Sequence, residues 1–523
     1  MSTKSIGTTG RHSGMLEADG TAKQVDMSER PSALNATDAI EMIRQGELTP
    51  DALLESCIAQ IEQVDPVVNA MITRAYDRAR EQAQLATQTA NRGDALGPLH
   101  GLPVAIKDIQ ATRGIRTTYG SAAYADNIPE EDAGIVQRIR EAGGIIIGKT
   151  NIPESSIGAN TVNRLFGATG NPYNPDLTCG GSSGGSAVAV ATHMAPLATG
   201  SDHGGSLRIP ACYCGVVGYR ATPGVVPNEG RSTLQTNYSV QGPMARSVSD
   251  VALLLSVIAQ RDANASKDPM AFPLDANHLA RLDDVDLSGL RVAVTADLGG
   301  VLVSETIRRT FTDRMNLIAP QFGTCDWHNI DLTDAPDVDW HVRQDLFVTQ
   351  YIDQASSWDA GFNPNIQATY RSALTTPMAA IASARRRQMA LFQSFRSIFD
   401  DYDLVLCPGV SIPPFPWQHL NPQQIDAKPV ENYMAWLALT SSLTVVGHPV
   451  VALPCGLDEQ GTPFGIQVVG AMYSDQRLLS ATKALEQYFS SVSTLAGPTP
   501  NFDVLSRTTS TCRTEGRVTP FKT

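Results

Sequence analysis

The sequence predicts an α/β fold with a mostly parallel or mixed β-sheet. Short apolar runs rich in β-branched residues alternate with segments of helical periodicity between residues 95 and 260. Such alternation favours strands joined by helices that pack on the sheet. The chain has 523 residues, of which 42% are hydrophobic, so it can bury a large core.

The N-terminal part is predicted to be a polar arm followed by helices. Residues 1–30 are rich in glycine, serine and threonine and lack the apolar stretch of a signal peptide, so we expect a flexible arm. Apolar residues recur at steps of three and four between residues 35 and 91, with Thr49-Pro50 as a start signal. This segment is expected to form N-terminal helices.

The central region, residues 95–260, is predicted to contain the alternating elements. Runs of apolar, β-branched residues indicate strands, and three- and four-residue periodicity indicates helices. We expect strands at residues 104–106, 145–147 and 196–200, and helices around residues 135–142, 187–194 and 248–259.

The second half is predicted to hold a helical region of about residues 290–440, after an irregular connection at residues 261–287. All five tryptophans lie beyond residue 320, and they either pack a helical cap or line an apolar pocket. We expect strands within residues 441–490, one of them at 464–470, and a polar tail at 506–523.

Composition and charge exclude several classes of protein. The net charge of −13 is spread along the chain without a basic block, which argues against nucleic acid or anionic membranes as partners. No run of eighteen apolar residues is present, so no membrane span is expected. Eight cysteines without a CxxC pair or clustered histidines predict a cytoplasmic protein with free thiols, no metal and no cofactor.

Two glycine-framed serine motifs are the strongest indication of chemistry. The first is Gly180-Gly181-Ser182-Ser183-Gly184-Gly185-Ser186, and the second is Asp202-His203-Gly204-Gly205-Ser206. Glycines let the backbone approach a reacting group and direct successive N–H groups at one point, as an oxyanion hole requires. One helix and one strand separate the motifs, so their serines can be neighbours and Ser206 is a candidate nucleophile.

A serine nucleophile needs a base, and Lys107 is the best candidate. It ends an apolar strand, where burial disfavours its charge and lowers its pKa, and a neutral lysine can accept a proton. Strand alternation directs Asp108 to the opposite face. None of the histidines has an evident carboxylate partner in the sequence. A lysine that only extends from a strand end toward solvent is the alternative interpretation.

In order and spacing, these motifs resemble the amidase signature family. The resemblance rests on Lys107, the two serine motifs and the continuation Leu207-Arg208-Ile209-Pro210, and it covers roughly residues 35–260 plus a strip near the C-terminus. It implies the amidase signature fold, a mixed β-sheet covered by helices on both faces. It also implies a single domain over residues 31–505.

The resemblance further implies a Ser-cisSer-Lys triad and an acyl-enzyme mechanism. Lys107 is then the base, Ser182 follows a cis peptide bond and carries the proton, and Ser206 attacks the carbonyl. The implied oxyanion donors are the N–H groups of His203, Gly204, Gly205 and Ser206. The implied supporting residues are Ser183, Asp202 and Arg208, and the implied acyl-pocket loop comprises Ser156, Ile157, Gly158 and Ala159.

One departure from the family pattern concerns the nucleophile turn. The family most often has a small or aliphatic residue where this chain has His203. The main-chain donor is retained, but the imidazole narrows or polarises the site.

The expected partners are a small-molecule amide and water. The tryptophans of the second half favour an aryl or apolar amide, and a homodimer is left open. The same triad can cleave carbamates and esters, because it attacks a carbonyl and does not choose the leaving group. A further alternative is the glutamine-hydrolysing subunit of a tRNA-dependent amidotransferase.

A nucleotide-binding protein is the rival class. Residues 143–150 formally match the phosphate-loop pattern G-x-x-x-x-G-K-[ST]. A phosphate loop follows its strand and opens a helix, whereas here the intervening residues are the predicted strand itself. The context therefore argues against nucleotide binding.

Overall fold

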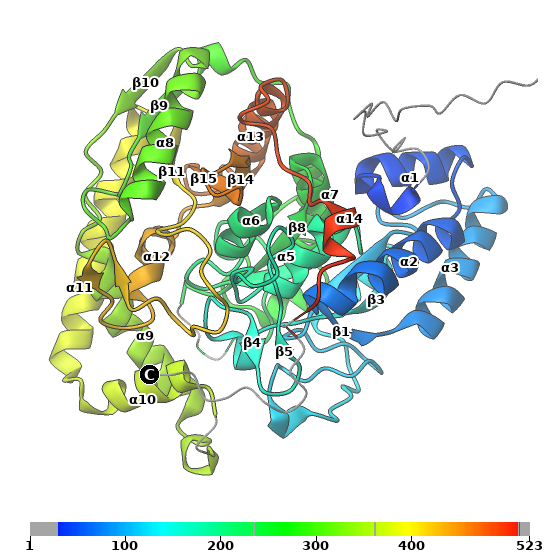
Figure 1. Ribbon diagram of the computed structural model, residues 1–523, viewed down its shortest axis with the longest axis horizontal. Coiled ribbons are helices and arrows are strands. Elements are labelled where there is room, and N and C mark those ends of the chain that lie inside the picture. Colours follow the sequence, from blue (N-terminus) through cyan, green and yellow to red (C-terminus); the bar gives the residue numbers. More distant parts are fainter. Residues whose placement is uncertain (1–29, 232, 234–235, 360–361, 511, 513–523) are drawn as a thin grey trace, which may run out of the picture.

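The computed structural model describes residues 30–231, 233, 236–359, 362–510 and 512. Almost all of the predicted arm at residues 1–30 and most of the tail at 506–523 lie outside these ranges. The described residues form one 11-stranded sheet with helices around it (Figure 1). None of the described helices is both long and apolar enough to cross a membrane.

The N-terminal helices are α1 (Ala36–Gln45), α2 (Pro50–Val68) and α3 (Tyr76–Asn91). The Thr49 hydroxyl caps α2 by accepting from the Ala52 N–H at 3.2 Å, and Pro50 occupies the first helical position, where its missing N–H costs nothing. The sequence predicted only helices here. The structure adds the edge strand β1 (Met71–Arg74), which pairs antiparallel with β3.

The first half of the chain supplies one side of the sheet. Its strands are β2 (Pro103–Lys107), β3 (Ile145–Thr150), β6 (Leu197–Asp202), β7 (Val217–Arg220) and β8 (Val240–Ala245). β2 lies between β3 and β6 and is parallel to both, while β6 pairs antiparallel with β8. The parallel arrangement brings the C-terminal ends of β2 and β6, which carry Lys107 and Asp202, to the same edge.

The second half completes the same sheet with β9 (Arg291–Val294), β10 (Thr324–Trp327), β11 (Leu404–Pro408), β14 (Val450–Leu457) and β15 (Pro463–Val469). The strand order is β1-β3-β2-β6-β8-β7-β14-β15-β11-β9-β10. Parallel pairs lie near both ends and antiparallel pairs in the middle. The predicted mixed sheet is confirmed.

Helices cover both faces of the sheet. The helices α5 (Gly184–Ala191) and α6 (Arg208–Cys214) pack on each other and on the sheet. A second layer consists of α4 (Gly134–Glu141), α7 (Val248–Ile258) and α13 (Asp475–Ser490), in which α7 contacts the other two. α5 is apolar on all sides and fully buried, which suits a helix inside a large core.

The remaining helices belong to the second half. They are α8 (Glu305–Ile318), α9 (Ala335–Tyr351), α10 (Pro364–Thr375), α11 (Met378–Ser397) and α12 (Ala438–Val446), and the short α14 (Phe502–Leu505) follows near the end. α9 contacts α10, α11 and α12, and this group lies at the opposite end of the molecule from α1–α3 (Figure 1). Two small hairpins complete the fold, β4 (Val162–Asn163) with β5 (Gly167–Ala168) and β12 (Gln424–Ile425) with β13 (Lys428–Pro429).

A substitution at Gly185 tests how tightly α5 packs against the residue that follows β3. A Cβ at this position would lie 2.4 Å from the Asn151 nitrogen and 2.7 Å from its oxygen, both backbone atoms. We expect Gly185→Ala to lower the free energy of unfolding by about 1–3 kcal/mol, because neither backbone can yield without displacing its element. Chemical denaturation measures this.

The matched control is Gly289→Ala. Gly289 is exposed and a Cβ there would meet nothing within 4 Å, so we expect a change of less than about 0.5 kcal/mol. Equal stability of the two variants would contradict the packing argument.

Candidate active site

Lys107 is the centre of the site. It ends β2 and is fully buried, and its Nζ lies 2.8 Å from Ser182 Oγ, 2.9 Å from Ser183 Oγ and 2.8 Å from Ser201 Oγ. No carboxylate contacts this amine among the described residues. Three hydroxyl groups therefore surround the lysine without a counter-charge.

Neighbouring elements bring these groups together. Ser182 and Ser183 directly precede α5, and Ser201 lies on β6, next to β2 in the sheet. The Gly181–Ser182 peptide bond is cis, the conformation that the family resemblance implies. Ser201 was not singled out from the sequence, because only the strand pairing shows that it reaches Lys107.

Burial lowers the pKa of Lys107 to about 7, and the charge of Asp202 opposes this only in part. A neutral lysine amine has two N–H donors and one lone pair, so it suits two acceptor hydroxyls and one donor hydroxyl. The Ser183 hydroxyl donates to the Ser201 carbonyl oxygen at 3.3 Å, so it can only accept from the amine. The donor hydroxyl is therefore that of Ser182 or Ser201, each 2.8 Å from Nζ.

A cavity of about 1300 Å³ lies over this cluster. Ser182, Ser201, His203 and Ser206 all line it. The Ser183 N–H donates to the Ser206 carbonyl oxygen at 3.2 Å, which holds the two serine motifs side by side. The structure thus brings Lys107, Ser182 and Ser206 to one place.

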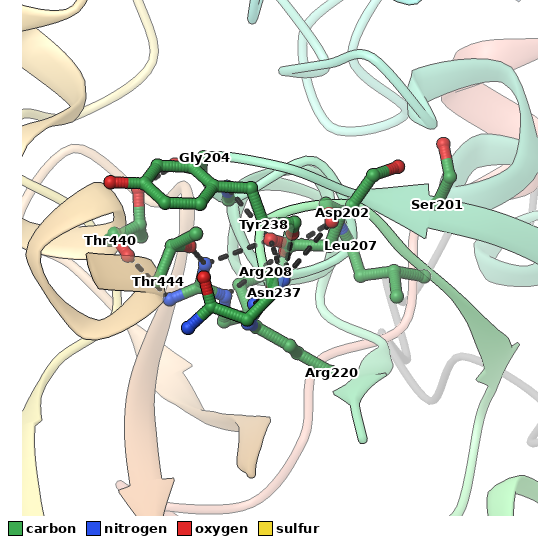
Figure 2. A network of polar contacts seen from close by, with 12 residues as sticks. Ser201, Asp202, Gly204, Leu207, Arg208, Arg220, Asn237, Tyr238, Thr440 and Thr444 are labelled. Carbon is green, nitrogen blue, oxygen red and sulfur yellow. Dashed lines mark hydrogen bonds and ion pairs between the residues drawn. The ribbon is translucent and has the colours of Figure 1, made fainter. Parts of the chain in front are cut away.

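The turn of residues 202–206, which carries the candidate nucleophile Ser206, is built around the buried carboxylate of Asp202. This carboxylate accepts from the N–H groups of Gly205 and Leu207 at 3.1 Å each, and it pairs with Arg208 at 2.9 Å and Arg220 at 3.3 Å (Figure 2). Burial acts to raise the pKa of Asp202, but the two guanidinium groups outweigh it and keep the pKa well below its usual value. The turn therefore folds around a permanent negative charge.

Helix α12 holds the other side of the turn. The Thr440 hydroxyl donates to the Gly204 carbonyl oxygen at 2.6 Å, and Arg208 donates to the Thr440 carbonyl oxygen at 2.7 Å and to Thr444 Oγ1 at 2.9 Å (Figure 2). Arg208 also reaches Gln467 on β15 at 2.9 Å. Arg220, Thr440 and Thr444 were not identified from the sequence, because no local motif marks them.

The predicted oxyanion donors are not equivalent in the structure. The Gly205 N–H donates to Asp202 instead of pointing freely to a substrate, which differs from the expectation. The N–H groups of His203, Gly204 and Ser206 have no acceptor in the described part of the chain. Three amides of the turn thus remain as candidate donors.

The imidazole of His203 lines the cavity and packs on the Tyr238 ring, with centroids 5.2 Å apart. Burial, together with the charges of Arg343 and Arg220, holds the pKa of His203 well below its usual value. The residue that departs from the family pattern is therefore neutral and adds no charge to the turn.

The predicted acyl-pocket loop reaches the cavity only in part. Ser156 and Ile157 line it, whereas Gly158 and Ala159 do not. The Asn363 side chain fixes this loop by donating from Nδ2 to the carbonyl oxygens of Glu154 at 2.9 Å and Ile157 at 2.8 Å.

The tryptophans do not form the cavity wall. None of Trp327, Trp340, Trp358, Trp417 and Trp436 is among the lining residues. They pack elsewhere, for example Trp436 on Phe415, Trp358 on Phe362, and Trp417 in a buried cluster with Val162 and Ala168 of the first half. The argument from tryptophans to an apolar pocket is therefore not supported.

The rival phosphate-loop interpretation is not supported either. Residues 145–150 of the pattern form β3, and Lys149 is buried, donating to the Gln110 carbonyl oxygen and to Thr112 Oγ1 at 2.8 Å. Its amine is thus already occupied by contacts within the protein. The described residues also contain no group of three histidine, cysteine or acidic side chains placed to hold a metal.

Comparisons with known proteins decide the family. The sequence profile of the Amidase family matches residues 52–332 and 347–479. The chain belongs to the amidase signature family. An acylamidase of Rhodococcus erythropolis is 31% identical over 477 residues, covering 87% of this chain and 95% of that protein. This amidase signature protein is accordingly an amide-hydrolysing enzyme.

Other amidase signature relatives have different names. A glutamyl-tRNA(Gln) amidotransferase component of Alkaliphilus metalliredigens (strain QYMF) is 31% identical over 468 residues, covering 85% of this chain and 94% of that protein. A bacterial aryl acylamidase structure matches with a TM-score of 0.81 at 24% identity, over 91% of this chain and 99% of that one, which shows the fold. A 6-aminohexanoate cyclic dimer hydrolase matches with a TM-score of 0.75 at 25% identity, over 90% and 99%.

The buried Asp202 cluster gives a stability prediction. We expect Asp202→Asn to lower the free energy of unfolding by about 3–5 kcal/mol, because two buried guanidinium groups lose their counter-charge. Glu55→Gln is the control, since Glu55 pairs with Arg80 at the surface at 2.6 Å and its loss should cost less than about 1 kcal/mol. Urea denaturation compares them, and similar losses would refute a central role for Asp202.

Proposed function

We propose that the enzyme hydrolyses the C–N bond of a carboxamide through an acyl-enzyme on Ser206. Lys107 acts as the base and Ser182 carries the proton between them. The observation that supports this most strongly is the 2.8 Å contact between Lys107 Nζ and Ser182 Oγ, made by a buried lysine that has no carboxylate partner among the described residues. A buried, uncharged amine next to a serine hydroxyl is suited to general-base catalysis.

The proposed reaction begins when Ser206 Oγ attacks the carbonyl carbon. Its proton passes to Ser182, and the Ser182 proton passes to Lys107. The N–H groups of His203, Gly204 and Ser206 stabilise the negative oxygen of the tetrahedral intermediate.

The relay then runs in reverse. The C–N bond breaks, the leaving amine takes a proton from Ser182, and Ser182 recovers one from Lys107. Water next attacks the ester formed on Ser206, using the same relay, and releases the acid. Each cycle thus consumes one water and returns Lys107 to its neutral form.

The leaving group is not determined by this chemistry. The relay acts on any carbonyl that reaches Ser206, so carbamates and esters are alternative substrates. Because the tryptophans do not line the cavity, they no longer favour an aryl or apolar amide. The name of the R. erythropolis relative still favours acylated amines as substrates. The size of the cavity favours a substrate larger than a simple primary amide.

A second candidate is the glutamine-hydrolysing subunit of a tRNA-dependent amidotransferase. Its support is the name of several relatives at 29–32% identity that match most of this chain. The same triad would then hydrolyse glutamine in a complex with other proteins. A cytoplasmic location and a homodimer remain predictions for either candidate.

The nucleophile is tested by hydrolysis of a substrate panel. We expect the enzyme to cleave at least one of a set of anilides, aliphatic amides, glutamine and aryl carbamates. Ser206→Ala should lower kcat by more than about 10³-fold. Ser239→Ala is the matched control, because Ser239 lines the same cavity away from Lys107 and should leave kcat unchanged. Equal activity of both variants would exclude Ser206 as the nucleophile.

The state of Lys107 predicts the pH dependence. With a pKa of about 7, Lys107 is protonated and inactive below this pH and neutral above it. We expect kcat/KM to rise tenfold per pH unit below pH 7 and to level off above about pH 8. Lys107→Arg should be inactive at every pH, because a guanidinium stays protonated. A flat profile between pH 5 and 8 would rule out this base.

A further inference from the structure

Three carboxamide side chains form a continuous row in the cavity wall. Gln110, Gln241 and Asn228 all line the cavity. Gln110 Nε2 donates to Gln241 Oε1 at 3.0 Å, and Gln241 Nε2 donates to Asn228 Oδ1 at 3.1 Å. Nothing in the proposed mechanism uses this amide row.

The buried end of the amide row determines its direction. Thr199 Oγ1 accepts from the Lys107 backbone N–H at 3.0 Å, so its own proton is free to go to Gln110 Oε1, which it contacts. Gln110 Nε2 also donates to the Gly200 carbonyl oxygen at 3.5 Å, which can only accept, so Gln110 presents its NH₂ group to Gln241. By the same logic Gln241 presents its NH₂ group to Asn228, so each amide in the row points the same way.

The amide row therefore ends in a donor. Asn228 uses its Oδ1 as an acceptor, and its Nδ2 has no acceptor in the described part of the chain. Hydrogen bonds in series polarise one another, which strengthens the last donor. The Asn228 backbone N–H donates to Asp268 at 2.8 Å, which fixes the residue in the wall.

Arg231 supplies a second donor at the same place. Its Nε contacts the other oxygen of Asp268 at 2.6 Å, so one carboxylate organises both residues. Arg231 also lines the cavity, its side chain is 4% exposed, and its buried Nη2 has no partner among the described residues.

The strand register places the amide row next to the catalytic cluster. Gln241 on β8 is the direct partner of Ser201 on β6. Residues opposite each other in an antiparallel pair share a face, so Gln241 lies beside the serine that contacts Lys107. A molecule attacked by Ser206 can thus extend along this wall.

We propose that Asn228 and Arg231 bind a second carbonyl oxygen of the substrate, so that the enzyme prefers compounds with two carbonyl groups, such as diamides or dicarbamates. This inference rests on the proposed function and specifies its substrate class. A neutral carbonyl fits better than a carboxylate, because Asp268 already pairs with the charge of Arg231.

Matched substrates test the inference on each side of the scissile bond. The acyl-side pairs are the 4-nitroanilides of succinamic, glutaramic, adipamic and pimelamic acids, each with the fatty-acyl 4-nitroanilide of equal length. The leaving-side pair is 4-acetamidobenzamide with 4-isopropylacetanilide. We expect the enzyme to favour the second carbonyl in at least one pair.

Asn228→Ala should lower kcat/KM for that favoured substrate by about 5- to 30-fold, the effect of one hydrogen bond. The value of kcat/KM for the matched substrate without the second carbonyl should change less than twofold. Asn228→Asp keeps the acceptor for Gln241 but removes the donor, so it should give the same loss in kcat/KM. It serves as the second test if the alanine variant is unstable. Asn264→Ala is the control, since Asn264 lines the cavity outside the row. Equal losses for both members of every pair would overturn the inference.

Gln241→Glu tests the direction of the amide row. A carboxylate cannot donate to Asn228 Oδ1, so the Asn228 amide should turn and present its oxygen to the cavity. The preference for the second carbonyl should then disappear, and a 4-nitroanilide with a terminal hydroxyl on its acyl chain should gain activity. Retention of the carbonyl preference would overturn the argument.

Binding separates this inference from the proposed function. Titration calorimetry of Ser206→Ala with the same pairs measures affinity without turnover, alone and combined with Asn228→Ala. Tighter binding of the second-carbonyl member, lost in the double variant, supports the subsite even if the chain cleaves nothing in the panel. Hydrolysis that depends on Ser206 without such a binding difference would overturn the subsite alone.

Discussion

The site depends on the interactions of one buried carboxylate, that of Asp202. It accepts hydrogen bonds from the backbone N–H groups of Gly205 and Leu207 and pairs with two arginines that are themselves fully buried. Arg208 continues the network to α12 and β15, in the second half of the chain. Removing such charges from water is expensive, so the cluster is stable only when every partner is in place. The turn of residues 202–206 is therefore stabilised by contacts from both halves of the sheet.

Burial has the opposite effect on the charge of Lys107. Asp202 keeps its charge because two cations contact it, whereas the described partners of the Lys107 amine are three hydroxyl groups, and burial lowers its pKa to about 7. Both groups lie at the same edge of the sheet, because β2 and β6 run parallel. A permanent anion that shapes the backbone and the amine that we propose as the base thus lie close together without forming an ion pair.

The lining of the cavity is the part of the site that a substrate would contact. Its lining combines carboxamides, hydroxyls and charged groups with apolar side chains such as Ile109 and Leu346, whereas the tryptophan clusters lie outside it. Polar groups in such a wall need partners, and those left without one in the protein are suited to bind a ligand. The amide row is oriented by Thr199, which also contacts the backbone of Lys107, so the proposed subsite and the proposed base share one support.

The sequence by itself determined the fold class, the positions of most strands and helices in the first half, and the serine and lysine motifs. These follow from periodicity, and from glycine-rich runs that are continuous in the chain. Tertiary structure alone decided that Ser201 contacts Lys107, that Thr440 holds the Gly204 carbonyl, that Gly205 donates to Asp202 and that the tryptophans lie away from the cavity. The physical reason is that such contacts join segments far apart in the chain or depend on backbone orientation, and neither leaves a local pattern.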